Sequence, residues 1–527
     1  MARFVNSADA ISSSLLLWNE PSTQLAIEET YNLKVYPVTS LLNEGPCNFV
    51  IPSQPQGLLN DIHIVTKFKV QKNGEDFSIP QKNISIVNNF ANSLWAEVSV
   101  IMSDRTELCQ SMRNSYAYQT FFNHALNSDQ QRAKYLFENE LFLMDQGLSK
   151  KSEEDLRVFW KWDHSKDYIF KDEVFEDGSE EEGKETLREG YWGATAINNP
   201  EYISGIKTML KSQHGSLPDN EFKIKLEDHL SRVEGWIPTR SNPAASIRSR
   251  KINAGKSVIL NSRFQCPLLN TSKCLPTNIK LRISLTKNRD EFLLLCDDDA
   301  GYSVVLEDCF LDVSYYKVRD EVLNLMEERL KIEAAPYTVT RPEILVRPVN
   351  HSGRIIRMSN IFHDKLPSYA FFALQRSADF EGTRFSKNGY VFIPFQKFNF
   401  YKNGVPYFVD PLEASNVTEV REGDFLYSEY GEYLRQLYRT IGKDSRGNCL
   451  IDNSNFHLNY MVGISFGADR SSLSERHLNL QEKASTYLEI DMGIDDVDVP
   501  EDLILIVYSL YDRQILIDSD RIIKLID

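Results

Sequence analysis

Gly255, Lys256 and Ser257 have the order that ends a phosphate-binding loop, in which backbone N–H groups and a lysine hold phosphate oxygens. That loop also needs a glycine five residues before Gly255, and the position is occupied by Arg250. A helix must follow the loop, whereas valine, isoleucine and leucine, which favour strands, come next. The segment is therefore interpreted as a turn before a strand and not as a nucleotide site.

Acidic residues offer a second kind of chemistry, because clustered carboxylates bind cations and paired carboxylates hydrolyse glycosides. Asp297, Asp298 and Asp299 precede Gly301, but the spacing and the closing glutamate of a calcium loop are missing. This pattern favours a solvated turn. The chain has 75 acidic residues, so finding a pair of them proves nothing about a glycosidase.

Histidine, cysteine and serine form no familiar motif. The nine histidines make no H-x-x-x-H pair, the seven cysteines make no C-x-x-C pair, and G-x-S-x-G is absent from the sequence. The sequence therefore predicts no catalytic residues, no metal ligands and no cofactor. Scattered cysteines in odd number are typical of free thiols in a reducing compartment.

The charge of the chain argues against direct binding to nucleic acid. The net charge is −16, and Arg3 is the only basic residue before Lys34, whereas proteins that hold the phosphate backbone carry a basic patch or tail. The longest apolar run, residues 503–510, is far shorter than the roughly 20 residues that cross a bilayer. We therefore expect neither sequence-specific nucleic-acid binding nor a transmembrane segment.

Alternation of apolar and polar residues runs through both halves of the chain and predicts antiparallel strands with one buried face. In the first half, Ile62, Ile64 and Phe68 alternate with polar side chains. The same alternation recurs at residues 222–226, 281–285, 311–315 and 487–492. Residues 503–508 are apolar on both faces, which indicates a central strand. Asn-Gly pairs at 73–74 and 403–404 predict hairpin turns.

Three segments have helical patterns: residues 123–143, 319–333 and 422–441. The second has an apolar stripe and ends before Pro336, and the third ends at Gly442. Strands therefore come first, then a helix near the middle, then strands again. Because strands and helices do not alternate, a parallel sheet is disfavoured.

This order predicts an all-β fold of two tandem antiparallel jelly-roll β-sandwiches, with a few short helices in loops and one helical connector. We assign residues 1–22 to an N-terminal arm and residues 23–318 to the first jelly roll. Residues 319–527 form the second, which begins with the connector helix. A long stretch at about 144–247 has few strand patterns and an acidic run, so it is interpreted as a loop insertion on a solvated surface.

Short segments in a fixed order carry a family resemblance. In the first half they are residues 87–100, which read Val-Asn-Asn-Phe and then Asn-Ser-Leu-Trp, and residues 114–118 and 279–290. In the second half they are residues 337–347, 366–367, 380–382, 432–435 and 515–521. In these segments the chain resembles the major capsid proteins of Polinton (Maverick) elements and adintoviruses. The resemblance covers most of the chain apart from about 144–240.

The resemblance implies a double jelly-roll structural protein and not an enzyme. It implies a homotrimer with a pseudo-hexagonal outline that tiles the icosahedral shell of a double-stranded DNA virus or virus-like element. Its partners would be itself, neighbouring trimers, and penton and minor capsid proteins. Its place would be the virion capsid, after assembly inside the host cell. A carbohydrate-binding β-sandwich protein without assembly activity is the alternative, and a carboxylate hydrolase is a third hypothesis.

The functional residues of a shell protein are those of its interfaces, which are rich in apolar and aromatic side chains. Three features have that composition: the N-terminal arm, an aromatic segment at 390–408 and the helix at 422–441. The candidate interface residues are Leu15, Leu16, Leu17, Trp18, Phe392, Phe398, Phe400, Tyr430, Tyr433 and Tyr438. The arm either latches onto its own core or reaches another subunit, and the helix either caps its own sandwich or faces a neighbour.

Overall fold

The computed structural model describes most of the chain outside the N-terminal arm and the predicted insertion. The described residues are 24–39, 45–76, 84–103, 106–145, 243–252, 255–296, 301–349, 353–362, 365–382, 389–414, 430–442, 448–453, 455–456, 458–473, 478–479, 481–493 and 502–526.

The first half of the described chain forms two four-stranded antiparallel sheets. Their strands are β1 (Ile27–Val35), β2 (Cys47–Ile51), β3 (Gly57–Lys72), β5 (Trp95–Met102), β6 (Thr106–Gln110), β7 (Val258–Arg263), β8 (Leu281–Lys287) and β10 (Tyr302–Val318). The sheet orders are β1-β10-β3-β7 and β2-β8-β5-β6. Numbered along the chain, these eight strands are arranged 1-8-3-6 and 2-7-4-5, which is a jelly roll. A short ribbon of β4 (Ser85–Ile86) and β9 (Leu294–Leu295) accompanies them.

The second half repeats this arrangement. Its strands are β11 (Ala335–Pro348), β12 (Ile355–Ser359), β13 (Tyr369–Arg376), β14 (Lys397–Lys402), β15 (Val405–Pro406), β17 (Val462–Ser465), β18 (Thr486–Asp491) and β19 (Leu503–Ile517). The sheet orders β11-β19-β13-β17 and β12-β18-β14-β15 are again 1-8-3-6 and 2-7-4-5. β16 (Leu412–Glu413) and β20 (Ile523–Ile526) add short pairings to β14 and β19. The predicted fold of two jelly rolls is confirmed.

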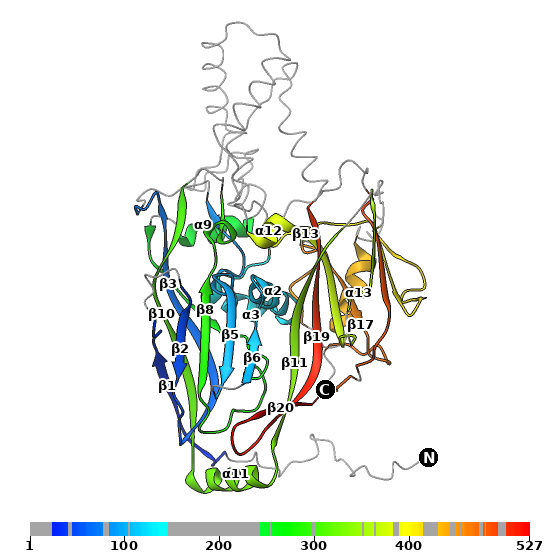
Figure 1. Cartoon of the computed structure of the whole chain (residues 1–527). Helices are drawn as coiled ribbons and strands as arrows, with labels where there is room; N and C mark the ends of the chain where they lie inside the picture. The colour runs from blue at the N-terminus through cyan, green and yellow to red at the C-terminus, as the bar shows by residue number, and fades with distance from the viewer. Residues whose placement is uncertain are drawn as a thin grey trace, which may run out of the picture.

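Helices lie in corresponding connections of the two jelly rolls. In the first, α2 (Ser115–Asn127), α3 (Gln130–Glu140) and α9 (Pro243–Ile252) lie between β6 and β7. In the second, α13 (Gly431–Ile441) lies between β16 and β17. The connector α11 (Asp320–Ile332) joins β10 to β11 at the lower end of both sandwiches (Figure 1). Short helices α1 (Phe90–Ser93), α10 (Asp290–Leu293) and α12 (Ser377–Glu381) occupy other loops.

The helix predicted at residues 123–143 is in fact two helices. α2 begins eight residues earlier than expected and ends at Asn127, where Ser128 is extended. Asp129 then caps α3 by accepting a hydrogen bond from the backbone N–H of Arg132. The pattern therefore missed a helix end because the break is made by a local cap and not by proline or glycine.

The strand predictions are confirmed at the level of faces. In β3, Ile62, Ile64 and Phe68 point into the sandwich, whereas the alternate residues His63, Val65 and Lys67 are partly exposed. In contrast, residues Leu503 to Leu510 of β19 are buried on both faces. The Asn-Gly turns at 73–74 and 403–404 have positive φ at both residues, as a tight hairpin requires.

Both ends of the predicted insertion are held together by a buried ion pair. Arg248 of α9 is fully buried, and its Nη2 donates to Oδ1 of Asp145 at 2.7 Å. Its Nε and Nη1 donate to the carbonyl oxygens of Ile86 and Leu143 at 3.1 and 2.9 Å. Residues 146–242, with most of the predicted acidic insertion, lie outside the described residues. The chain thus leaves and re-enters the first jelly roll at one fixed point.

Replacing Arg248 by leucine should lower the free energy of unfolding by about 3–5 kcal/mol, because a buried ion pair and the hydrogen bonds to the carbonyl oxygens of Ile86 and Leu143 are lost. Urea denaturation measures this. The double replacement Arg248→Leu with Asp145→Leu should recover part of the loss, because the carbonyl oxygens of Ile86 and Leu143 stay unpaired. Lys251→Leu on the same helix is the control, since its pair with Glu138 is exposed and contributes less than about 1 kcal/mol. Equal effects of Arg248→Leu and Lys251→Leu would contradict this role.

Candidate interaction surfaces

The described residues hold no cluster of three or more His, Cys, Asp or Glu side chains arranged to bind a metal. Ser257, from the segment that resembles a phosphate loop, donates its hydroxyl to Glu307 at 2.6 Å and leads directly into β7. Asp297, Asp298 and Asp299 lie outside the described residues. Among the helices that are described, none is long and apolar enough to cross a membrane.

The aromatic residues predicted at an interface are mostly core residues. The side chains of Phe392, Phe398, Phe400 and Tyr433 have no exposed area. A side chain without exposed surface cannot contact another copy of the folded chain, so these four are corrected to the core. The residues of the N-terminal arm, Leu15, Leu16, Leu17 and Trp18, lie outside the described residues.

Helix α13 caps its own sandwich with its aromatic face. The hydroxyl of Tyr433 donates to the carbonyl oxygens of Gln396 and Leu412, both at 3.0 Å. Tyr430 and Tyr438 are half-buried and pack against the same core. Of the two roles considered for this helix, its aromatic face has the capping role.

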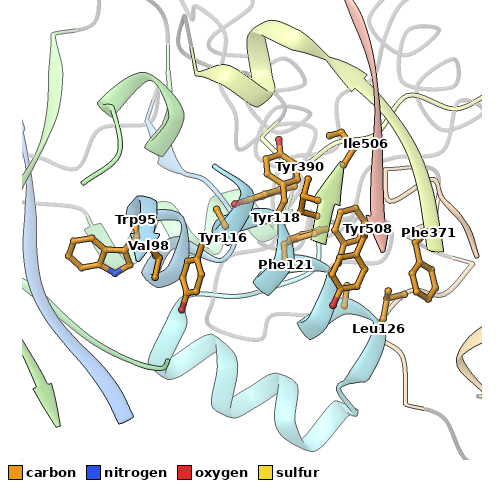
Figure 2. Close-up of a cluster of buried hydrophobic side chains, with 14 of the residues drawn as sticks. Trp95, Val98, Tyr116, Tyr118, Phe121, Leu126, Phe371, Tyr390, Ile506 and Tyr508 are labelled. Atoms are coloured by element: carbon orange, nitrogen blue, oxygen red, sulfur yellow. The ribbon is translucent and has the colours of Figure 1, made fainter. Parts of the chain in front are cut away.

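Helix α2 fills the space between the two sandwiches. Phe122 stacks on Tyr508 of β19, with ring centroids 5.1 Å apart and planes 8° apart. Phe121 stacks on Tyr390, with centroids 4.5 Å apart and planes 5° apart. Figure 2 shows Phe121, Tyr390 and Tyr508 between Trp95 of the first sandwich and Phe371 of the second. Stacked pairs of this kind each contribute about 0.5–1.5 kcal/mol beyond their buried area.

Hydrogen bonds fix the register of this contact. The hydroxyl of Tyr118 donates to Oε1 of Gln375 in β13 at 2.7 Å, and Nδ2 of Asn114 donates to the carbonyl oxygen of Phe380 at 2.6 Å. Burial raises the pKa of Tyr118 and of Tyr390, because the phenolate would lose its hydration. Both hydroxyls therefore stay protonated around neutral pH, and the contact does not titrate there.

A second set of hydrogen bonds joins the jelly rolls beside the connector. Nε of Arg521, which follows β19, donates to the carbonyl oxygen of Thr277 in the first jelly roll at 2.9 Å. Its Nη2 reaches Oε1 of Glu327 in α11. The hydroxyl of Tyr337 in β11 also donates to the carbonyl oxygen of Cys274 at 2.7 Å. The two sandwiches therefore form one rigid body with a continuous core.

The two jelly rolls differ in what covers their 1-8-3-6 sheets. In the second, α2 covers the outer face of β13 and β19, so both strands are buried on both sides. In the first, the residues on the outer face of β1-β10-β3-β7 are partly or fully exposed. We call this face the open face, and it is made by the outward residues of these strands, including Val65, Phe310, Ile259, Asp312 and Asp61.

Charged groups on the open face form a local network. Nε of Arg263 lies 3.0 Å from Oδ1 of Asp61, and Nδ1 of His63 lies 3.0 Å from Oδ1 of Asn261. Partial burial alone would raise the pKa of Asp61, but the hydrogen bond with His63 and the charge of Arg263 lower it overall. The hydrogen bond to Asp61 likewise raises the pKa of His63. The lowered pKa keeps the Asp61 carboxylate charged around neutral pH.

A hollow of about 630 Å³ lies beside α13 at the edge of the second jelly roll. The guanidinium of Arg470 lies 4.4 Å from the ring centroid of Tyr407, and Arg439 lines the same hollow. Oγ of Ser465 is buried there and has no hydrogen-bond partner among the described residues. We call this region the α13 edge, defined by Arg435, Arg439, Tyr407, Val409, Arg470 and the hollow they surround or adjoin.

Solved structures of viral proteins resemble this architecture over nearly its whole length. A chain of the Sputnik virophage has a TM-score of 0.52 at 9% identity and covers 99% of this chain and 93% of that chain. VP54 of the virus PBCV-1, fitted into a reconstruction of Sputnik, has a TM-score of 0.51 at 9% identity, with 97% and 99% covered. The major capsid protein of Faustovirus has a TM-score of 0.51 at 8% identity, with 96% and 93% covered.

The chain shares the double jelly-roll fold of these proteins. No protein-family model matches its sequence, and no curated protein matches it either. At 8–9% identity the likeness shows the fold and no more. The activity of the chain therefore has to be inferred from its own surfaces.

The residue pattern did not predict that α2 is the central contact between the sandwiches. Its residues Tyr118, Phe121 and Phe122 have a composition that strands prefer, yet they lie in a helix that is buried almost all round. A helix that is apolar on all sides is normally buried between other elements. The apolar residues Phe121, Phe122, Ala125 and Leu126 spread over more than one face of the helix. This spread is the feature of the sequence that indicates burial between two other elements.

Phe122→Ala should lower the free energy of unfolding by about 3–5 kcal/mol, because it opens a cavity between the two sandwiches. Urea denaturation followed by fluorescence should still show one transition, since both jelly rolls share the contact. Tyr135→Ala is the control: Tyr135 is exposed on the neighbouring α3, and its loss should change the stability by less than about 0.5 kcal/mol. Two separate transitions, with one unshifted, would contradict a shared core.

Proposed function

We propose that the chain is a major capsid protein, a structural subunit without catalytic activity that assembles into a viral shell. Three copies would form a pseudo-hexameric capsomer, and capsomers would tile an icosahedral shell of a double-stranded DNA virus or virus-like element. The protein would reside in the virion capsid after assembly inside the host cell.

The observation that carries this proposal is the duplication. The same strand order, with a helix in the same connection, occurs twice in one chain and is fixed as one rigid body. Three copies of a chain with two similar sandwiches place six similar sandwiches in a ring. Such a ring has a hexagonal outline, which packs in a hexagonal lattice. The resemblance of the fold to viral proteins, including the major capsid protein of Faustovirus, supports the same proposal.

The finer assignment rests on the sequence resemblance. The segments at 87–100, 114–118 and 515–521 favour the Polinton and adintovirus type, with penton and minor capsid proteins as further partners. The N-terminal arm with Leu15 to Trp18 is proposed as a contact segment. The acidic insertion is proposed as an outward turret. Because the net charge is −16, the genome would be neutralised by another component.

Purified protein should be a trimer by native mass spectrometry, with a mass three times the 60.7 kDa of the chain. Negative-stain microscopy at high concentration should show hexagonal particles, patches or shells. The physical reason is that a rigid pair of blocks with complementary ends closes into a ring. A protein that stays strictly monomeric at high concentration would contradict the proposal.

A further inference from the structure

We propose that the N-terminal arm folds back on its own copy and places its apolar residues, Leu15 to Trp18, in a groove beside connector α11. We call this the α11 groove. It is lined by Leu323, Met326 and Leu330 of α11, Leu58 and Pro276 of the first jelly roll, and Tyr337 of β11. The inference rests on the proposed role of the arm as a contact segment and names the surface that the arm contacts.

Helix α11 has an apolar stripe that the described part of the chain covers only in part. Leu323, Met326 and Leu330 follow one another at helical spacing and all line the α11 groove. None of the 13 residues of α11 is buried, and Met326 has 44% of its surface exposed. Because an amphipathic helix normally buries its apolar stripe against another element, this stripe indicates a further contact.

The α11 groove is already formed and has the size of a binding site. Its volume is about 380 Å³, within the roughly 300–1,000 Å³ of concave sites that bury a ligand. The hydroxyl of Thr277 donates to Oε1 of Glu327 at 2.7 Å, and the hydroxyl of Tyr337 donates to the carbonyl oxygen of Cys274 at 2.7 Å. These bonds fix the walls of the groove, so that an occupant does not have to order them.

The charges around the α11 groove favour an uncharged occupant. Two basic and two acidic side chains line it: Lys273, Arg329, Glu327 and Glu333. With no net charge in the lining, the groove attracts neither a cationic nor an anionic partner. The apolar residues would therefore decide what binds.

The arm starts at one end of this groove. The backbone N–H of Arg319, the residue before α11, donates to the carbonyl oxygen of Ala26 at 3.0 Å. Trp18 lies eight residues before Ala26, a distance of at most about 28 Å when extended. Helix α11 has 13 residues and is about 20 Å long. The apolar residues of the arm can therefore reach any part of the groove.

The composition of the arm fits the groove. Residues 15–18 are four consecutive large apolar residues, and no charged residue lies between Asp9 and Glu20. Burial of this segment removes apolar surface from water and desolvates no charge. A segment tethered beside its site has an effective concentration on the order of millimolar. The arm of the same copy is therefore favoured over a separate peptide and over the arm of another copy.

Cys274 also lines the α11 groove and is partly exposed, so that its reactivity reports whether the groove is covered. Leu16→Ser combined with Trp18→Ser should raise the rate of alkylation of Cys274 by iodoacetamide at least about fivefold, because the apolar anchor of the arm is lost. Site-resolved mass spectrometry measures this rate. Cys266, which is buried in the first jelly roll, is the internal control and should react no faster. An unchanged rate at Cys274, or an equal rise at Cys266, would overturn the inference.

A photo-crosslinker at position 18 locates the surface that the arm contacts. We expect links to peptides spanning 273–277 or 320–332. Met326→Asp should reduce these links at least about fivefold, because it places a charge in an apolar groove. Leu325→Asp is the matched control, since Leu325 is the neighbouring residue on α11, is 66% exposed and does not line the groove. Equal losses in the two variants, or links to other surfaces alone, would contradict docking in the groove.

Isotope labelling shows which copy supplies the arm. In protein mixed from 15N-labelled and unlabelled copies before assembly, the crosslinks should join segments that carry the same label. Links between differently labelled segments would show docking on another copy and would overturn the inference. The experiment gives the same result in a monomer and in a trimer, so a protein that never assembles contradicts the proposed function and not this contact.

Discussion

The structure depends on the two-sided burial of helix α2. A sheet in a sandwich has one face toward its own core and one face outward, and an outward face can be apolar only if another element covers it. The rings of Phe121 and Phe122 supply that cover for the second jelly roll. Because this contact is apolar, stacked and fully buried, the two sandwiches cannot rotate relative to each other without exposing it. A rigid pair of blocks is the consequence.

The same constraint explains why the strands of the first sandwich were easier to predict from the sequence than those of the second. In β3, the alternation of apolar residues such as Ile62, Ile64 and Phe68 with polar ones indicates a sheet with one solvent-exposed face. In β19, residues 503–508 are apolar throughout because α2 lies outside them. Period and apolar content are local properties, so the fold class could be predicted from the sequence. The element that covers the second face comes from a distant part of the chain. The apolar residues of β19 indicated only that some element must cover this face.

Interface residues were harder to predict for the same physical reason. Aromatic composition indicates burial, but it does not distinguish burial inside a chain from burial between chains. Phe392, Phe398 and Phe400 satisfy the composition rule and lie in the core. Exposed positions such as Ile259 and Arg439 are single residues among ordinary surface side chains.

The contrast between the two kinds of contact follows from when each is formed. The surface between the jelly rolls is covered as the chain folds and is never exposed to water afterwards, so it consists of stacked rings and a few buried hydrogen bonds. A surface that meets a second copy is exposed on every newly folded monomer, and a large apolar patch there would aggregate. The open face has ion pairs such as Asp61 with Arg263 around a small apolar centre. On such a surface, ion pairs limit the apolar area that is exposed to water before a partner binds.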